Sequence, residues 1–241
     1  MESFTLPLRA VIDPVGAVPR AVEGRRWLTA VVLVSVLTAL SGAAIGARLD
    51  ASRLVIPELA RSGELAKASE REISEAVDQK QRVSLVAGVA KGVFAVPLMV
   101  LGLGVILKLA AWLLGRKALF IECFTAAALA TLPLAVLRGL ELVAALKTPV
   151  LTPAMAAALI PSGLGALVEV TSPGLGRALG AVDLINIWAA LLLGLGFAAA
   201  TRWAPWKGAL FGLLLYVLFA SAFLVGLPGL IPAGPPPMGG H

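Results

Sequence analysis

Residues 120–146 form an apolar stretch long enough to cross a lipid bilayer, and this feature constrains the fold more than any other. A membrane-spanning helix needs about 20 consecutive apolar residues, and this stretch has 27. It is the middle one of five such stretches, which occupy residues 27–47, 85–114, 120–146, 181–200 and 206–227. The sequence therefore predicts an all-α integral membrane protein with five transmembrane helices.

Composition supports this class and excludes others. Of the 241 residues, 59% are hydrophobic and 14% are charged, whereas soluble domains are about one quarter charged. The net charge of +6 would suggest nucleic-acid binding in a soluble protein. Here the basic residues flank the apolar stretches, which makes them topology signals instead. We expect one membrane domain over residues 27–228, the lipid bilayer as its surroundings, and no nucleic-acid partner.

The long polar segment, residues 48–84, lies between the first two stretches and is predicted to be an extracytoplasmic loop. Its seven basic and seven acidic residues balance each other. From Glu64 onward it lacks Gly and Pro until Gly88, which predicts a continuous helix. Ser69 and Glu72 match the spacing of a helix capping box. Their position in the middle of the predicted helix favours a chance match.

This polar segment has two readings. Opposite charges four residues apart, such as Arg71 and Glu75, stabilise a solvated helix that projects from the membrane. Alternatively, the segment is a docking surface for a partner. Its candidate docking residues are three apolar anchors and one ion pair: Leu65, Ile73, Val77, Arg71 and Glu75.

Arg138 and Glu141 are charges within the middle stretch. They are three residues apart and therefore share one face of a helix. If the helix is straight, Arg138 lies about 27 Å from Phe120, near the far headgroups. One reading is an interfacial pair that extends toward water. The other is a buried pair that faces another helix or a partner subunit.

Basic residues set the predicted orientation. Four of them lie in residues 1–26, Arg116 and Lys117 separate the second and third stretches, and Arg202 and Lys207 separate the fourth and fifth. The positive-inside rule places these ends, and the N-terminal segment 1–26, in the cytoplasm. The C-terminus is then extracytoplasmic. The cytoplasmic ends also carry four tryptophans, as an aromatic belt does: Trp27, Trp112, Trp203 and Trp206.

Three further segments flank the stretches. Residues 15–22 have the pattern of a short amphipathic helix on the membrane surface, although Pro19 interrupts it. Residues 153–170 are apolar but broken by Pro161-Ser162-Gly163, which predicts an interfacial or re-entrant segment before the fourth helix. A sixth span there stays open as an alternative. The tail, residues 229–241, is rich in proline and predicted to be disordered.

The sequence offers little for catalysis or metal binding. One cysteine, Cys123, and one histidine, His241, cannot supply a metal cluster or a catalytic dyad within the membrane. We therefore expect no catalytic residue, no metal and no cofactor. Glycines within the apolar stretches are predicted to be points of close helix packing: Gly102, Gly104, Gly194 and Gly196.

Three parts of the sequence resemble the Yip-domain family. They are Asp13-Pro14 ahead of Arg25-Arg26-Trp27, the start of the middle stretch at residues 120–133, and the run from Asp183 to Trp188 with the glycines that follow it. The chain departs from the family pattern at Ala128-Leu129, where Gly-Tyr is usual. It also lacks the long N-terminal region of eukaryotic members, so binding of Rab-type GTPases is not carried over.

The resemblance, with a composition rich in Ala, Leu, Gly and Arg, implies a bacterial inner-membrane protein. Some bacterial family members are similar to companions of ABC-type exporters. The prediction is a non-enzymatic accessory or scaffold subunit of an ABC-type transporter complex. The alternatives are a small self-contained transporter or channel, and a membrane-organising or trafficking-type factor. A transporter would need polar groups near the bilayer midplane and internal repeats, and neither is visible in the sequence.

Overall fold

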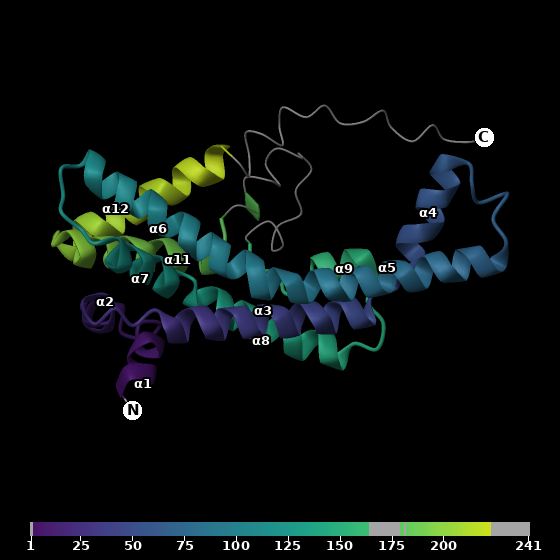
Figure 1. Ribbon diagram of the computed structural model, residues 1–241, viewed down its shortest axis with the longest axis horizontal. Coiled ribbons are helices and arrows are strands. Elements are labelled where there is room, and N and C mark those ends of the chain that lie inside the picture. Colours follow the sequence, from purple (N-terminus) through teal and green to yellow (C-terminus); the bar gives the residue numbers. More distant parts are fainter. Residues whose placement is uncertain (1, 164–178, 181, 223–241) are drawn as a thin grey trace.

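The computed structural model describes residues 2–163, 179–180 and 182–222 (Figure 1). Over these residues the fold is helical, and five helices are long and apolar enough to cross a membrane. The prediction of an all-α protein with five spans is confirmed. The helices in chain order are α1 (Glu2–Arg9), α2 (Pro14–Glu23), α3 (Leu28–Arg48), α4 (Ser52–Ser62), α5 (Glu70–Ala90), the π-helix η1 (Lys91–Ala95), α6 (Val96–Leu113), α7 (Phe120–Ala130), α8 (Leu132–Lys147), α9 (Pro153–Ala157), α11 (Leu184–Thr201) and α12 (Pro205–Phe219).

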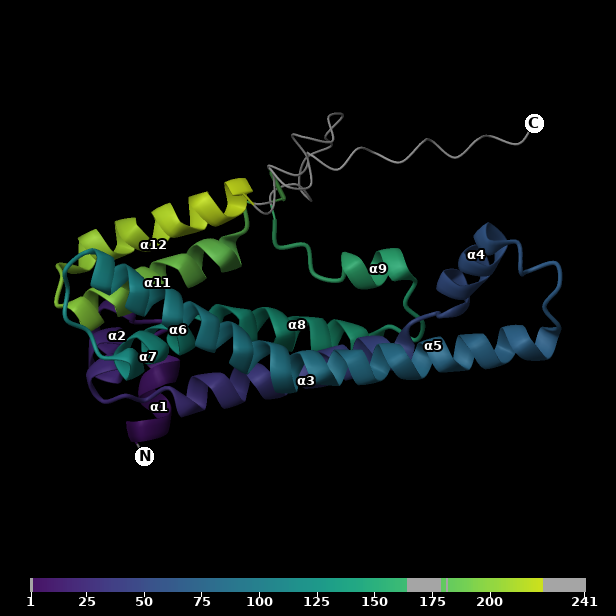
Figure 2. The ribbon, with the colours of Figure 1, turned by 45° about the horizontal axis from the view of Figure 1, so that its top comes forward.

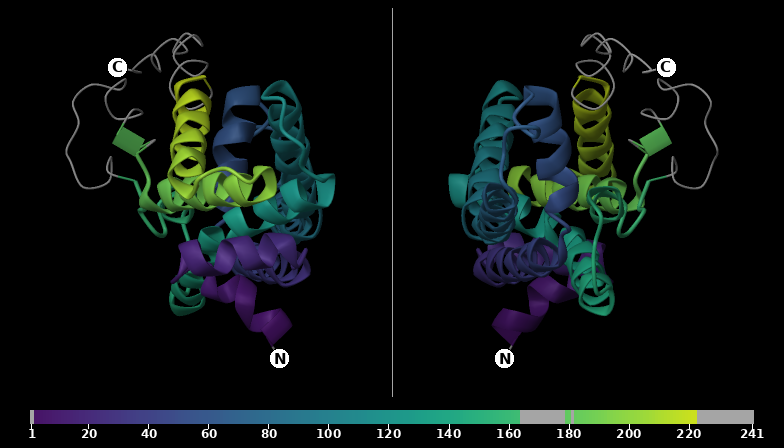
Figure 3. Two further views of the ribbon diagram at one scale, coloured as in Figure 1. Left: turned by 90° about the vertical axis from the view of Figure 1, so that its left-hand side faces the viewer. Right: turned by 90° about the vertical axis from the view of Figure 1, so that its right-hand side faces the viewer.

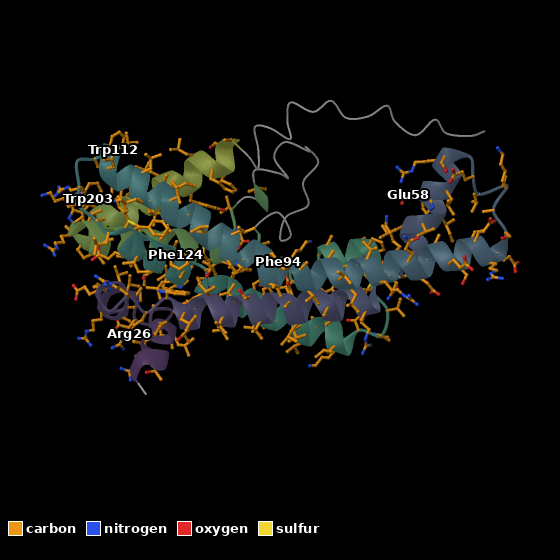
Figure 4. The ribbon with its side chains drawn as sticks, in the orientation of Figure 1. Arg26, Glu58, Phe94, Trp112, Phe124 and Trp203 are labelled. Atoms are coloured by element: carbon orange, nitrogen blue, oxygen red, sulfur yellow. The ribbon has the colours of Figure 1, made fainter. Side chains whose placement is uncertain are left out.

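The spans run along the long axis of the molecule, which gives it two different ends (Figures 1 and 2). α3 packs along both α5 and α8, and α11 forms an antiparallel pair with α12. One end, which we call the tryptophan end, carries Trp27, Trp112, Trp203 and Trp206; Figure 4 labels two of them. The opposite end, which we call the hairpin end, carries α4 and the first turns of α5.

The second span is part of a much longer helix. α5, η1 and α6 form one continuous helix of 44 residues, Glu70–Leu113. At 1.5 Å per residue it is about 66 Å long, roughly twice the 30 Å thickness of a bilayer core. Because its apolar part lies toward the tryptophan end, α5 projects beyond the other helices at the hairpin end (Figure 2).

The polar segment before α5 is organised differently from its prediction. The prediction of a continuous helix from Glu64 is wrong, because α4 ends at Ser62, its C-cap Gly63 is left-handed (φ 74°), and α5 begins only at Glu70. The Ser69–Glu72 capping box is real, so the chance-match reading is also wrong. The Ser69 N–H donates to Glu72 Oε2 at 2.7 Å, and the Glu72 N–H donates to Ser69 Oγ at 3.3 Å. The Ser69 N–H and the Ser69 hydroxyl both donate to the Glu72 carboxylate, and these two bonds lower the pKa of Glu72.

The middle span is the centre of the core, but it is not one straight helix. α7 ends at Ala130 and α8 begins at Leu132, because Pro133 lacks the N–H that would continue the ladder. The Thr131 hydroxyl donates to the Ala128 carbonyl at 2.7 Å at this break. α7 lies between α6 and α11. All of its residues from Thr125 to Ala130 are buried.

α2 lies crosswise to the long helices at the tryptophan end (Figures 1 and 3). The Asp13 side chain caps it by accepting a hydrogen bond from the Gly16 N–H at 3.0 Å. Its buried face, which includes Val18 and Val22, packs against α7 and α11. The predicted amphipathic helix therefore exists, and its apolar face contacts protein.

The segment before the fourth span is only partly described, and the C-terminal tail is not described. α9 begins at Pro153, and its N-cap Thr152 accepts a hydrogen bond from the Met155 N–H at 3.2 Å. Residues 164–178, which include the end of the predicted interfacial segment, lie outside the described residues. The predicted disordered tail, residues 229–241, lies outside them as well.

Candidate functional site

A cavity of about 480 Å³ with a polar lining lies between α3, α5 and α8, with α9 beside it. It lies in the half of the bundle nearer the hairpin end. Its polar lining comes from three hydroxyl groups and three charged groups: Thr38, Ser41, Ser84, Lys91, Arg138 and Glu141. We call these six side chains and the space between them the polar cavity. All but Ser84, which lies on the charged helix α5, come from otherwise apolar helical segments, where a polar side chain is costly unless it has a partner or a function.

Arg138 and Glu141 form an ion pair in this cavity. The Arg138 guanidinium lies 2.5 Å from Glu141 Oε2, and the two side chains are 32% and 14% exposed. The Nε of Arg138 is buried and has no hydrogen-bond partner in the described part of the chain. Because the pair faces α3 across the cavity, this geometry favours the protein-facing reading over the interfacial one.

Two more groups in the cavity lack partners among the described residues. Thr38 is 8% exposed, and its hydroxyl is buried with no hydrogen-bond partner. The Ser41 hydroxyl, one turn further on, donates to the Thr38 carbonyl at 3.2 Å and leaves the Thr38 hydroxyl unmatched. Lys91 has no carboxylate within 4 Å in the described part of the chain. With Arg138 neutralised by Glu141, Lys91 gives the cavity a net positive charge.

Close packing of α3 against α5 forms one wall of the cavity. A Cβ on Gly42 would lie 2.6 Å from the Gly88 carbonyl oxygen, and a Cβ on Gly46 would lie 2.7 Å from the Leu85 Cα. The sequence signal for this contact is two glycine pairs with four-residue spacing, Gly42/Gly46 and Gly88/Gly92, a pattern typical of close helix pairs. This contact was not predicted from the sequence, and neither were Thr38 and Ser41 as site residues.

Three of the four predicted packing glycines lie in close contacts between described helices, and the fourth does not. A Cβ on Gly196 would lie 2.5 Å from the Ala126 Cβ, and one on Gly104 would lie 3.1 Å from the Phe124 Cα. Gly194 contacts the backbone of Gly208 on α12. A Cβ on Gly102 would meet no described atom within 4 Å. Close packing at Gly102 therefore stays a prediction that would require a partner.

The predicted docking residues lie on and beside the hairpin formed by α4 and α5. Arg71 and Glu75 form an ion pair of 2.9 Å on the surface of α5, with side chains 88% and 66% exposed. The three apolar anchors are each half-buried: Leu65, Ile73 and Val77. Lys80 of α5 bridges to Glu58 of α4 at 3.2 Å, which holds the two arms together. A docking role for these residues stays a prediction.

Asp183 is a buried structural residue at the start of α11. Its carboxylate accepts hydrogen bonds from the Ile185 N–H at 2.8 Å, the Asn186 amide at 3.0 Å and the Ser162 hydroxyl at 2.8 Å. It therefore caps the helix and ties it to the segment that precedes it. The Asp183–Trp188 run thus contributes helix capping, and its acidic residue is fully engaged.

Aromatic side chains pack together at the tryptophan end. The Trp203 ring packs edge-on against Phe197 with centroids 5.7 Å apart, and Arg116 lies 5.5 Å over that Trp203 ring. A smaller cavity of about 280 Å³ lies between α2 and α11. Among the residues that the structure describes, no group of three or more His, Cys, Asp or Glu could hold a metal ion.

Neither the curated proteins nor the solved structures contain a match to this chain. A family model does match, over residues 8–227, and its description is the Yip1 domain. Because that match covers most of the 241 residues, the chain belongs to the Yip1 domain family of multi-pass membrane proteins.

Proposed function

We propose that this Yip1-domain protein is an accessory or scaffold subunit that docks onto another membrane protein through the α4–α5 hairpin. Members of the family are non-enzymatic membrane-associated factors. The observation that carries the proposal is the projection of α5 beyond the bundle, which presents a charged helix outside the apolar layer. A partner with its own spans and an extramembrane domain would meet both the bundle and this hairpin.

The hairpin has the features of a preformed docking element. The capping box at Ser69 fixes where α5 begins, and the Lys80–Glu58 bridge joins its two arms. Its surface carries charges of both signs, so recognition depends on local complementarity rather than on long-range attraction. The Arg71–Glu75 pair is the most suitable local contact, because both side chains are well exposed and their positions are already ordered.

The finer proposal is that the partner is an ABC-type transport complex in the inner membrane of a bacterium. The orientation predicted from the basic residues would place the tryptophan end in the cytoplasm and the hairpin outside. Cysteine labelling tests the orientation directly. In intact cells an impermeant reagent should label Ser74→Cys and leave Lys117→Cys unlabelled. The opposite pattern would refute the orientation and would place the hairpin on the nucleotide-binding side of the transporter.

Co-purification tests the docking proposal. The double variant Arg71→Glu/Glu75→Arg keeps an ion pair within α5 and reverses what a partner meets. Purified in mild detergent, it should insert normally and recover about tenfold less partner, since loss of a charge-assisted contact costs 1.5–3 kcal/mol. The matched control, Arg71→Lys/Glu75→Asp, keeps both charges and should recover the partner. Wild-type recovery of the partner by the reversed variant would contradict docking at this hairpin, and absence of ABC-type subunits from the native complex would contradict the finer proposal.

The described core weighs against a self-contained transporter or channel. The polar cavity lies toward the hairpin end, and the core nearer the tryptophan end consists of buried apolar residues such as Leu129, Phe197 and Ala126. A solute path would need polar groups to continue through that region. The membrane-organising or trafficking-type alternative is compatible with family membership. It has one supporting feature here, the crosswise α2 at a membrane boundary.

A further inference from the structure

The polar cavity holds more hydrogen-bonding capacity than the described residues use. The buried Thr38 hydroxyl and the Arg138 Nε have no partner, and Lys91 has no carboxylate within 4 Å, all within the described part of the chain. Buried polar groups in folded proteins nearly always have a partner. The two buried groups, the Thr38 hydroxyl and the Arg138 Nε, therefore point to a ligand that accepts hydrogen bonds, and the exposed Lys91 ammonium adds a positive charge beside them.

We propose that the polar cavity binds the phosphodiester headgroup of an anionic phospholipid. The two buried groups and the Lys91 side chain are all donors: a hydroxyl, a guanidinium N–H and an ammonium. A phosphodiester presents acceptor oxygens and carries a single negative charge. That charge matches the net positive charge left on Lys91 once Glu141 neutralises Arg138. This inference is independent of docking at the α4–α5 hairpin.

The position of the cavity favours a lipid over a soluble phosphate compound. The cavity is also lined by Leu49 and Ser84, which lie where the first two apolar stretches meet the polar segment 48–84, near the level at which headgroups begin. Apolar side chains next to the cavity residues face outward, with Phe94 65% exposed and Leu140 51% exposed. Phe94 lies one turn from Lys91, and Leu140 lies between Arg138 and Glu141. Acyl chains would cover these side chains, whereas free phosphate would leave them uncovered.

Local backbone structure supports a built site. The π-helix η1 begins at Lys91, and the wider turn of a π-helix often marks a functional position. Next to it, Gly92 contacts the backbone of Ser35 and Ala39 on α3. This contact fixes the base of the Lys91 side chain against the helix that carries Thr38. The donors of the site therefore come from helices held in a defined geometry, which is what a specific headgroup site requires.

Titration of the delipidated, purified full-length protein with defined lipids tests the proposal, with bound lipids counted by native mass spectrometry. Dioleoyl-phosphatidylglycerol should bind at one site at least tenfold more tightly than dioleoyl-phosphatidylcholine, whose headgroup is neutral overall. Lys91→Gln should weaken phosphatidylglycerol binding about tenfold, the effect of one charge-assisted contact. Arg82→Gln is the matched control. It removes one exposed positive charge on the same helix, about 14 Å away, and should change binding less than twofold.

The effect of Thr38→Val on lipid binding and on the stability of the apo protein distinguishes a cavity that binds a headgroup from one that stays empty. It keeps the shape of the side chain and removes the hydroxyl. If the cavity binds the headgroup, binding should weaken about fivefold and the thermal stabilisation by phosphatidylglycerol should shrink. Unchanged binding, together with a more stable apo protein, would overturn the proposal, since it would show an unmatched hydroxyl with no ligand.

A competition arm separates the two sources of the phosphate group. Millimolar inorganic phosphate or glycerol 3-phosphate should not displace phosphatidylglycerol if acyl chains contribute to binding. If either compound displaces phosphatidylglycerol from the wild type but not from Lys91→Gln, the cavity is a phosphate site and its assignment to a lipid is overturned. Equal binding of both lipids, unaffected by Lys91→Gln, would overturn the site itself. None of these results depends on a protein partner, so they stand apart from the test of the hairpin.

Discussion

Gly42→Ala tests the close packing of α3 against α5. The new Cβ would lie 2.6 Å from the Gly88 carbonyl oxygen and 2.7 Å from the Gly88 Cα. Both are backbone atoms, so no side-chain rotation can relieve the overlap and the two helices must move apart. We expect the variant to insert into the membrane, since its apolar composition is unchanged, and to unfold at a lower temperature than the wild type.

Two effects of opposite sign set the magnitude. Overpacking of a tight contact costs about 1–3 kcal/mol, and a contact between backbones belongs at the upper end. Alanine is favoured over glycine in a helix by about 1 kcal/mol. The net loss is then about 2 kcal/mol in the free energy of unfolding, or roughly 4–8 °C in the melting temperature of a chain of this size. Gly88→Ala should lower the free energy of unfolding less in the Gly42→Ala background than in the wild type, because Gly42→Ala has already moved the two helices apart.

Thermal unfolding in detergent, followed by intrinsic tryptophan fluorescence, measures this change. Gly102→Ala is the matched control, because a Cβ there meets no described atom within 4 Å. Helix propensity alone then predicts a rise of roughly 2–4 °C in the melting temperature. Equal stability of Gly42→Ala and wild type would refute the close contact. A strong loss in Gly102→Ala would indicate packing of α6 against a second protein.

Three further variants test other parts of the structure. Replacing both Arg138 and Glu141 by alanine should lower the melting temperature less than the sum of the two single replacements, because either single replacement leaves an unpaired charge. Purely additive losses would mean that the pair is solvated. Asp183→Ala should cost about 2 kcal/mol in unfolding, as a lost cap leaves two side-chain donors unmatched, and Asp183→Asn should cost less. Because the pKa of Glu72 is lowered in the folded state, the stability it gives α5 is present above the ordinary pKa of 4.5 and is lost as the pH falls through the lowered value. Hydrogen exchange in the first turn of α5, corrected for intrinsic rates, should accelerate over that window in the wild type and not in Glu72→Gln, whose side chain does not titrate.

The five spans could be predicted because transfer into a bilayer depends on the composition of each stretch and hardly on its neighbours. The same independence explains why the bounds of the first and fourth helices, Leu28–Arg48 and Leu184–Thr201, lie within a few residues of the predicted stretches. The capping box at Ser69 was also present in the sequence. It was misjudged because residues 64–68 carry no glycine or proline and look helical, while α4 in fact ends at Ser62.

Packing partners could not be predicted, because they depend on which faces of two helices meet. Gly42 and Gly102 each lie in an apolar helix beside other small residues, yet the first contacts the backbone of Gly88 and the second contacts no described atom. The polar cavity is a consequence of such packing. Thr38 on α3 and Lys91 in the long helix are 53 positions apart in the sequence, and neither has a neighbour in the chain that marks it as part of a site.

Close packing and the polar cavity have one structural cause. Gly42, Gly46 and Gly88 line the cavity and also form the contact between α3 and α5. Without side chains at these positions the backbones touch, and the space toward α8 is left unfilled. A larger residue at Gly46 would act in two ways, by separating the helices and by changing the volume beside Arg138. Variants of these glycines should therefore alter the stability of the bundle and headgroup binding together, whereas Lys91→Gln should alter binding alone.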